Sequence, residues 1–436
     1  MVVLVLGSGA REHALVRSLA LDPEVDRVVA LPGNPGIAAL ADCLPGDPAD
    51  PDVVTAAARA EGADLVVVGP EAPLVAGVAD ALADEGIPCF GPSARAAALE
   101  GSKAFAKEVM AAAGVPTAAA HVCTRIDEVQ HALDATGPPY VVKEDGLAAG
   151  KGVVVTTDRD QAVEHATACL TRGEGRVVVE DFLDGPEVSV FCLSDGHDVI
   201  ALEPAQDFKR VGAGDTGPNT GGMGAYSPLP WAPEDLVPQV LDTIARPTIT
   251  EMAVRGMPFV GVLYVGLALT STGPRVVEFN ARFGDPETQT VLARLRTPLG
   301  RVLRAAARGE LGGLPALEWS PRTSVNVVIA AEHYPASPTT GDPISGIEQA
   351  EQVDGVHVLH AGTRPSDDAD GDLEAPGLVS AGGRVLSVVS LADDLPQARA
   401  RAYAAAGRID LRGSHHRPDI ALAAEQGQVA VPTQES

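Results

Sequence analysis

The segment VVEFNARFGDPETQ carries two oxygen-bearing side chains and an arginine at alternate positions of a predicted strand. Glu278, Asn280 and Arg282 should share one face, because successive side chains of a strand point to opposite faces. A carboxylate and an amide oxygen suit Mg²⁺, which takes few protein ligands and keeps its other positions for phosphates and water. Arg282 could then bind an acyl phosphate or a carboxylate through two nitrogens. On spacing alone, a set of surface salt bridges is the alternative.

A glycine-rich stretch, VVKEDGLAAGKGVVV, occupies residues 141–155. Gly146 and Gly150 are one residue closer than the P-loop pattern requires, and Gly152 stands where that pattern needs a hydroxyl for magnesium. A Walker-type loop is therefore disfavoured. The apolar runs on either side predict a hairpin whose loop could close over an anion.

The distribution of lysine also indicates an anion site. Only five of the 32 basic residues are lysine, and all five lie between positions 103 and 209. An arginine-rich coding bias explains the low number, but it should spare lysine where a compact ammonium is needed. The five are Lys103, Lys107, Lys143, Lys151 and Lys209.

The strand VVVEDFLDGPEVS places Glu180, Phe182 and Leu183 beside a turn, with Glu187 following. An apolar slot with backbone donors and acceptors suits adenine, and a nearby carboxylate suits ribose hydroxyls. An edge strand with solvated acids is the alternative for this segment taken alone.

Length and charge narrow the class of protein. A chain of 436 residues exceeds what one core organises, so two to four domains are expected. The net charge of −27 disfavours nucleic acid and anionic membranes as partners. Five scattered cysteines predict neither a disulfide framework nor a zinc site, and no apolar stretch is long enough to span a bilayer. We expect a cytoplasmic protein without an export signal.

The first hundred residues alternate strand and helix patterns, which predicts a parallel sheet with right-handed crossovers. The loops after its strands lie at the carboxyl edge, where such sheets bind ligands. The first loop, GSGAREH, has Glu12 where a dinucleotide fingerprint has its third glycine, so an NAD site is disfavoured. The amides of Gly7, Ser8 and Gly9 could still hold a phosphate or a carboxylate.

Further along the chain, Ser102 is a predicted N-cap, and residues 117–184 form a smaller α/β unit. The glycine-rich segment 207–230 is too long for a simple connector and is predicted to be a functional loop. A helix over 233–255 and a hairpin follow it. Residues 325–424 should form a separate unit, followed by a loose tail over 425–436.

One arrangement accounts for these motifs together: ATP held between two small α/β units. The motifs are a lysine on a helix, a lysine on a strand, a glycine-rich loop, an acidic strand and a strand with the pattern Glu-x-Asn. This combination resembles the ATP-grasp superfamily. The segments VLGSGAREHAL, DGLAAGKGV, KRVGAGDTGPNTGGMGAYSP and EFNARFGDPETQ look like its phosphoribosylamine–glycine ligase family, over residues 1 to about 424.

The resemblance implies an α/β multidomain fold. An N-terminal parallel-sheet domain, the pre-ATP-grasp domain, should span 1–101, and an ATP-grasp core with a mobile lid at about 117–184 should span 102–324. A small C-terminal mixed β/α domain should span 325–424. The implied reaction joins glycine to 5-phosphoribosylamine with ATP through glycyl phosphate, giving glycinamide ribonucleotide, ADP and phosphate in purine synthesis. Mg²⁺ or Mn²⁺ is the implied metal.

The resemblance also implies roles for individual residues. ATP should contact Lys103, Lys143, Gly146, Gly150, Lys151, Gly152, Glu180, Phe182, Leu183 and Glu187. The metal should be held by Glu278 and Asn280, with Arg282 and Asp215 as catalytic residues and Thr216 and Asn219 beside Asp215 at the glycine and amine end. The ribose phosphate end should involve Ser8, Gly9, Arg11 and Glu71.

Some positions depart from the family pattern. Glu144 stands where relatives usually have alanine, and strand alternation from Lys143 predicts that its side chain points away from the nucleotide. The strand VLYVGLALT lacks an acid that many ATP-grasp enzymes carry, which makes a second metal less secure. Glu332 and His333 have no predicted role.

Two other classes of protein remain open. Another ATP-grasp enzyme, such as a biotin carboxylase, would share the ATP residues without needing the DTGPNTGGMGA loop. A nucleotide sensor that has lost catalysis could dispense with Lys143, Glu278 and Arg282.

Overall fold

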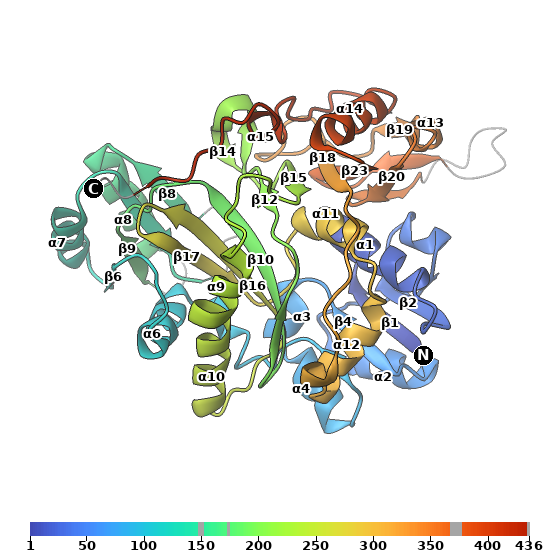
Figure 1. The fold of residues 1–436 in the computed structure, drawn as a ribbon, viewed down its shortest axis with the longest axis horizontal. Coiled ribbons are helices and arrows are strands. Elements are labelled where there is room, and N and C mark those ends of the chain that lie inside the picture. The colour runs from blue at the N-terminus through green and yellow to red at the C-terminus, as the bar shows by residue number, and fades with distance from the viewer. Residues whose placement is uncertain (147–151, 172–174, 367–376, 434–436) are drawn as a thin grey trace.

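The computed structural model describes residues 1–146, 152–171, 175–366 and 377–433 (Figure 1). Its N-terminal unit is built on a parallel sheet with the strand order β3-β2-β1-β4-β5, which confirms the predicted βαβ series. The strands are β1 (Val2–Gly7), β2 (Arg27–Pro32), β3 (Asp42–Cys43), β4 (Leu65–Val68) and β5 (Cys89–Phe90). The helices are α1 (Ala10–Ala20), η1 (Ile37–Ala39), α2 (Pro51–Glu61), α3 (Glu71–Val75), α4 (Val78–Asp84) and α5 (Ala98–Gly101).

A small antiparallel sheet with the order β6-β9-β7-β8 follows the helix α6 (Lys103–Ala113). The hydroxyl of Ser102 accepts a hydrogen bond from the amide of Phe105 at 3.1 Å, so the predicted N-cap is confirmed. The elements are β6 (Ala120–Cys123), α7 (Ile126–Thr136), β7 (Tyr140–Glu144), β8 (Val153–Thr156), α8 (Arg159–Leu170) and β9 (Val177–Glu180). β7 and β8 pair antiparallel, which confirms the predicted glycine-rich hairpin.

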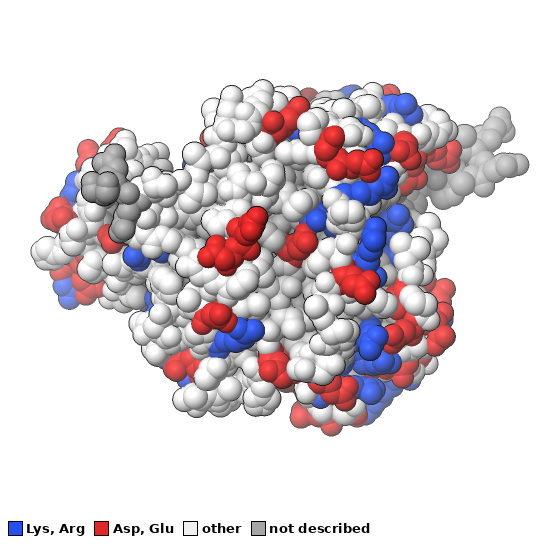
Figure 2. Space-filling model, viewed as in Figure 1, with Lys and Arg blue, Asp and Glu red and all other residues white. Residues whose placement is uncertain are grey.

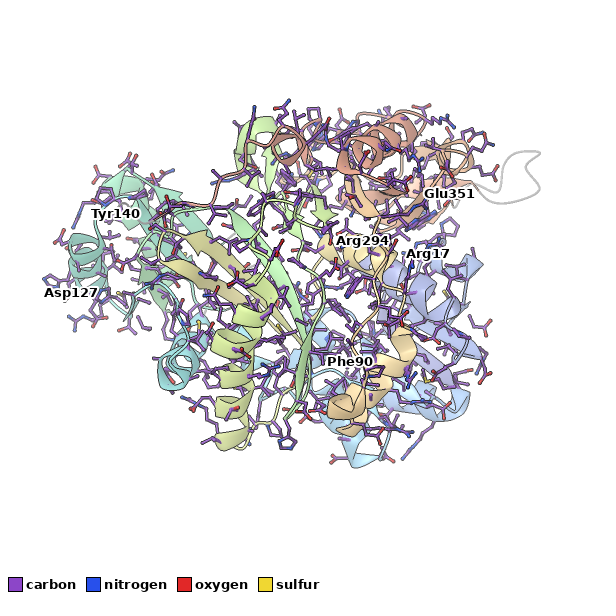
Figure 3. The ribbon with its side chains drawn as sticks, viewed as in Figure 1. Arg17, Phe90, Asp127, Tyr140, Arg294 and Glu351 are labelled. Carbon is purple, nitrogen blue, oxygen red and sulfur yellow. The ribbon has the colours of Figure 1, made fainter. Side chains whose placement is uncertain are left out.

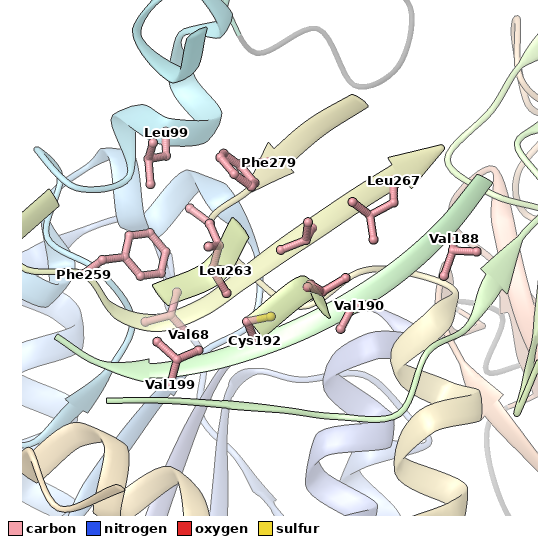
Figure 4. Packing of buried hydrophobic residues seen from close by; sticks show 14 of the residues in the cluster. Val68, Leu99, Val188, Val190, Cys192, Val199, Phe259, Leu263, Leu267 and Phe279 are labelled. Carbon is pink, nitrogen blue, oxygen red and sulfur yellow. The ribbon is translucent and has the colours of Figure 1, made fainter. Parts of the chain in front are cut away.

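The long strands β10 and β16 form the centre of a second sheet, with the order β11-β10-β16-β17. Its strands are β10 (Glu187–Asp195), β11 (Val199–Ala201), β16 (Val260–Thr270) and β17 (Gly273–Asn280). The helix predicted over 233–255 is present as α9 (Leu236–Val240), the π-helical segment η3 (Leu241–Ala245) and α10 (Arg246–Val254). Figure 4 shows Val190, Cys192 and Leu263 of this sheet in one buried cluster with Val68 and Leu99, so the N-terminal unit shares this core.

The glycine-rich segment 207–230 is not one loop, and that prediction is wrong. It contains β13 (Arg210–Gly212), η2 (Ala213–Asp215), β14 (Thr216–Asn219) and β15 (Gly224–Ser227), and β12 (Gln206–Asp207) precedes them. β15 pairs with β18, so this segment joins the sheet β12-β15-β18-β23-β20 of the C-terminal unit. Glycine content hid these short strands, because glycine has low strand propensity.

The C-terminal unit completes that sheet and adds a smaller one with the order β21-β22-β19-β24. Its strands are β18 (Thr323–Ala330), β19 (Pro343–Ser345), β20 (Val356–His360), β21 (Thr363–Pro365), β22 (Leu378–Ser380), β23 (Arg384–Ala392) and β24 (Asp410–Leu411). The remaining helices are α11 (Glu287–Arg294), α12 (Leu299–Arg308), η4 (Leu311–Gly313), α13 (Ile347–Glu351), α14 (Leu395–Ala406) and α15 (Leu422–Glu425). Within the described ranges, no helix has the length and apolar character needed to cross a bilayer.

The segment after α15 crosses from the C-terminal unit toward β8 and β17 (Figure 1). Val431 packs against the main core, and Val429 lines a cavity beside Phe182 and Leu183. Val429 and Val431 of the predicted tail are therefore packed against the rest of the chain. Apolar residues near the end of a polar segment bind a surface that the sequence alone does not identify.

Candidate functional site

A cleft between the units contains two adjoining cavities. The first, the charged cavity, has a volume of about 380 Å³ and is lined by residues of all three units, including Arg11, Arg282 and Arg384. The second, the tail cavity, has a volume of about 580 Å³ and is closed on one side by the C-terminal segment. Both are lined by Lys143, Val153, Glu180, Asp207, Lys209, Thr220, Val277 and Glu278.

Glu278 and Asn280 line the charged cavity from β17, where they pair with Gly266 and Tyr264 of β16. Burial alone would raise the pKa of Glu278, but the nearby lysines, Lys209 first, hold it below its usual value. Its carboxylate is therefore charged at neutral pH.

These two oxygen donors fit a divalent ion that keeps positions for phosphates and water. Within the parts of the chain that the structure describes, no group of three His, Cys, Asp or Glu side chains could hold a metal without such help. The donor set therefore suits an ion brought in with a nucleotide rather than an all-protein cage.

Arg282 is clamped by two carboxylates. Its Nη2 lies 3.1 Å from Glu100 Oε1 and its Nε lies 3.4 Å from Glu71 Oε2. Burial lowers the pKa of Arg282, but Glu100 and Glu71 more than offset this and raise it above its usual value. Burial raises the pKa of Glu100, although Arg282 and the amide of Ala281 oppose the shift. The guanidinium is thus held just beyond the end of β17.

Four of the five lysines also line this cavity, namely Lys103, Lys107, Lys143 and Lys209. Lys143 Nζ lies 2.8 Å from Glu180 Oε2, and Lys107 Nζ lies 3.2 Å from Glu180 Oε1. Lys103 Nζ donates to the Gly146 carbonyl at 2.9 Å. Burial lowers the pKa of Lys103 and of Lys107. Glu180, predicted to contact adenine, is bound between two lysines where the cavities meet.

The glycine-rich loop is only partly described. Gly146 and Gly152 line the charged cavity, whereas Gly150 and Lys151 lie outside the described residues.

Phe182, Leu183 and Glu187 line the tail cavity, as an adenine and ribose site requires. The Phe182 side chain is 49% exposed, and Glu187 Oε2 accepts a hydrogen bond from Lys209 Nζ at 2.6 Å. An exposed aromatic ring at the mouth of a cavity is available for stacking on a planar ligand.

The structure does not bring Asp215 or Thr216 to Arg282. Asp215 has a left-handed backbone, with φ of +54°, and its Oδ1 accepts from Arg417 Nη1 at 2.6 Å. Asp215 and Asn219 line the tail cavity, and Thr216 lines neither cavity of the cleft. The β13–β14 hairpin directs these residues away from Arg282. Thr220 and Gly221 reach the charged cavity instead.

At the edge of the N-terminal sheet, Arg11 and Glu71 line the charged cavity, but Ser8 and Gly9 do not. Glu12 Oε2 already accepts the amide of Gly9 at 2.6 Å, so this amide is not free for a phosphate. A Cβ on Gly7 would lie 2.7 Å from Glu12 Cγ, so glycine is needed where the Glu12 side chain packs.

Sequence reasoning missed several groups of the charged cavity. Asp207 is one, and burial, only partly offset by Lys209, raises its pKa to about 8. Glu287 is another, and its Oε1 accepts from the Tyr264 hydroxyl at 2.9 Å. Tyr264 lies on the strand that lacks the acid of many ATP-grasp enzymes, and its contact with Glu287 is not visible from either segment alone.

Arg384, from the C-terminal unit, was also missed. Its Nη2 lies 3.1 Å from Asp285 Oδ2, and its Nη1 donates to the Asp285 carbonyl at 2.7 Å and to the Gly221 carbonyl. It joins the glycine-rich segment to the loop after β17. The sequence separation of 99 residues between Arg384 and Asp285 removes any local signal.

His360 and the two residues without a predicted role, Glu332 and His333, line neither cavity of the cleft. His360 donates its amide to His13 Nδ1 at 2.8 Å, across the N- and C-terminal units. His333 has φ of +66° in a turn, and its Nδ1 lies 3.2 Å from Thr339 Oγ1. These contacts are structural.

Three family models match consecutive parts of the chain. They are described as the N domain, the ATP-grasp (A) domain and the C domain of phosphoribosylglycinamide synthetase, over residues 1–100, 101–288 and 324–423. Phosphoribosylamine–glycine ligase of Streptomyces coelicolor is 61% identical, over 97% of this chain and 99% of that protein.

Solved structures agree. Phosphoribosylamine–glycine ligase of Thermotoga maritima superposes with a TM-score of 0.82 at 31% identity, over 96% of this chain and 100% of that one. The biotin carboxylase domain of the Hydrogenobacter thermophilus 2-oxoglutarate carboxylase has a TM-score of 0.68 at 17% identity, over 95% and 91% of the chains, which shows the shared fold alone. The predicted α/β architecture with an ATP-grasp core is confirmed. By its three matched domains and its extent of identity, the chain belongs to the phosphoribosylamine–glycine ligase family.

Proposed function

We propose that this chain joins glycine to 5-phosphoribosylamine with ATP, giving glycinamide ribonucleotide, ADP and phosphate. The observation that carries the proposal is one charged cavity that gathers Arg282, Glu278, Asn280 and buried lysines, in a chain of this family. The reaction needs charge neutralisation and positioning more than a strong base, and the cavity supplies both.

In the first step, the carboxylate of glycine attacks the γ-phosphate of ATP, which forms glycyl phosphate and releases ADP. Lys103 and Lys143 bind the phosphates, and Lys143 exchanges part of its contact with Glu180 for a phosphate oxygen. Glu278 and Asn280 hold Mg²⁺ or Mn²⁺, which neutralises phosphate charge when it is bound. Gly146, Gly150, Lys151 and Gly152 belong to the loop that covers the phosphates.

In the second step, the amine of 5-phosphoribosylamine attacks the glycyl carbonyl and phosphate leaves. Arg282 stabilises the negative charge of the acyl phosphate and of the departing phosphate. Glu71 and Glu100 hold the guanidinium in place, at 3.4 Å and 3.1 Å. Arg11 and Glu71 form the end for the ribose phosphate, and Ser8 and Gly9 are left out of it because they do not line the cavity.

The tail cavity holds the nucleoside. Adenine lies against Phe182 and Leu183 with Glu180 beside it, and Glu187 binds the ribose. Since Asp215 and Asn219 line this cavity, we assign them to its wall rather than to amide formation.

The test is an ADP-release assay with glycine and freshly prepared 5-phosphoribosylamine. Release should require ATP, a divalent ion and both substrates, and mass spectrometry should detect glycinamide ribonucleotide. ADP release that is unchanged when glycine or the amine is omitted would contradict the proposal. A bicarbonate-dependent reaction in their absence would favour a carboxylase.

A further inference from the structure

A further cavity of about 360 Å³ lies where α1, the loop after α11 and the C-terminal unit meet. We call it the junction cavity. It shares no lining residue with either cavity of the cleft. Its volume falls in the range of small-molecule sites. In Figure 2, basic side chains gather along this junction of the N- and C-terminal units.

Two arginines of the junction cavity have no carboxylate partner. Among the described residues, no acidic side chain lies within ion-pair distance of Arg17 or Arg296, although the chain has 59 acidic residues. Figure 3 shows Arg17 on α1 and, nearby, Arg294. Arg294 illustrates the usual situation, because it pairs with Glu203 and donates to the Ser320 carbonyl at 3.1 Å.

The acidic residue of the lining does not compete for these arginines. Asp22 Oδ1 accepts the amide of Glu24 at 2.8 Å, and Asp22 Oδ2 accepts the amide of Gly300 at 2.7 Å. Burial first, and Arg17 second, lower the pKa of His357 to about 3, so its imidazole is neutral and can donate one hydrogen bond. The cavity therefore presents two guanidinium groups without a carboxylate partner, of which Arg17 is half-buried and Arg296 is exposed to solvent.

A buried amide provides an independent sign of a ligand. Gln289 lines the junction cavity and is 1% exposed, and its Oε1 has no hydrogen-bond partner in the described structure. Its Nε2 donates to Asp285 Oδ1 at 2.7 Å, which fixes the orientation of the amide. An unsatisfied buried acceptor is costly. Because this oxygen has almost no exposed surface, a ligand hydroxyl would satisfy it once the amide turns toward the cavity.

We propose that the junction cavity binds a phosphate-bearing anion, held by the guanidinium groups of Arg17 and Arg296 and by donors from His357. A protonated phosphate oxygen or a ligand hydroxyl would donate to Gln289. Phosphate suits the site because guanidinium groups bind its oxygens through paired, charge-assisted hydrogen bonds. The anion is either free orthophosphate or the phosphate group of a small ester.

The test uses the full chain with ADP, Mg²⁺ and glycine at saturation, which fills the nucleotide and glycine positions of the cleft, and the arginine variants distinguish the junction cavity from the positions that stay open. Orthophosphate, ribose 5-phosphate and AMP are titrated by isothermal calorimetry. The variant R17Q/R296Q is compared with R301Q/R308Q, which removes two charges at exposed arginines that line none of the three cavities. Retained ADP binding shows that each variant is folded.

At least one probe should bind the wild type and R301Q/R308Q equally, and R17Q/R296Q at least about tenfold more weakly. Binding of orthophosphate identifies the free ion as the ligand. Binding of an ester alone identifies a phosphorylated metabolite. Equal affinity in all three proteins, or no binding of any probe to the wild type with the cleft occupied, would overturn the proposal.

Discussion

The charged cavity takes its side chains from all three units and ties them to one another, whereas the tail cavity is closed by partly exposed apolar groups. Arg282 is held by Glu100 and Glu71, and Arg384 is held by Asp285. In the tail cavity, Phe182 is 49% exposed, and another part of the wall is formed by Ala423 and Ala424 of α15 and by Val429.

This difference between the two cavities follows from the group that each is proposed to bind. Charge that develops during phosphoryl and acyl transfer is stabilised best by groups fixed beforehand, because reorganising them would cost free energy at the transition state. Adenine needs an apolar surface and a few polar contacts, and such a surface tolerates small movements. Substitutions in the charged cavity should therefore lower turnover, and those in the tail cavity should weaken ATP binding.

The largest effect is expected for Arg282→Ala. Loss of the guanidinium should lower kcat for amide formation by about 10² to 10³, the range for removing one charge-stabilising donor. ATP affinity, measured by calorimetry, should stay within about twofold of the wild type because Arg282 does not line the tail cavity.

Arg282→Lys is the matched control, since it keeps the charge but loses the bidentate geometry. Its kcat should lie between those of the wild type and Arg282→Ala. Wild-type turnover in Arg282→Ala would remove this residue from the reaction.

The next prediction concerns Glu278→Gln, whose activity is measured as Mn²⁺ is titrated. Second-shell substitutions already weaken metal binding by about 10- to 100-fold, so removal of a ligand charge should cost at least about tenfold in activation by Mn²⁺. Glu187→Gln is the control, because both carboxylates lie near Lys209 and only Glu278 lines the charged cavity. Equal Mn²⁺ dependence in the two variants would show that Glu278 does not bind the metal.

Arg384→Ala tests whether the C-terminal unit serves the charged cavity. The contacts of the guanidinium with Asp285 and with the Gly221 carbonyl would be lost. We therefore expect kcat/KM for the amine substrate to fall about tenfold while KM for ATP stays unchanged. Arg322→Ala removes an exposed ion pair with Asp393 and should change neither parameter. A rise in KM for ATP alone would place Arg384 on the nucleotide side.

For the tail cavity, Phe182→Ala should raise KM for ATP about fivefold with kcat unchanged, which corresponds to about 1 kcal/mol of lost aromatic contact. GTP should be tested in parallel. The ratio of the KM for GTP to the KM for ATP should be smaller in this variant than in the wild type. A fall in kcat without a change in KM would contradict the assignment of this cavity to the nucleoside.

The sequence predicted the parts of the cleft that local patterns encode. Glu278 and Asn280 were found because alternation along one strand is a short-range property. Arg282 also lines the charged cavity, but from the loop beyond the end of β17, so strand alternation does not account for its place. Arg384 and Asp285 were missed because their contact joins distant segments, and a lone arginine in a strand carries no sign of its partner. The sequence does not reveal that Asp215 lines the tail cavity rather than the charged one, because glycine-rich strands conceal where a hairpin turns. The C-terminal segment was read as loose because its binding surface belongs to another unit.

The smallest effect is expected for Glu144→Ala, which tests strand alternation beside the phosphate-binding lysine. Glu144 lines neither cavity of the cleft, and its Oε2 lies 3.9 Å from Cys169 Sγ on α8, on the opposite face of β7 from Lys143. The predicted outward orientation is therefore confirmed. KM for ATP in Glu144→Ala should stay within about twofold of the wild type, whereas Lys143→Gln should raise it by about tenfold or more, because only the lysine reaches the cleft. A clear fall in KM for ATP in Glu144→Ala would mean that the carboxylate turns toward the phosphates when the nucleotide binds, and β7 would then have to rotate during closure.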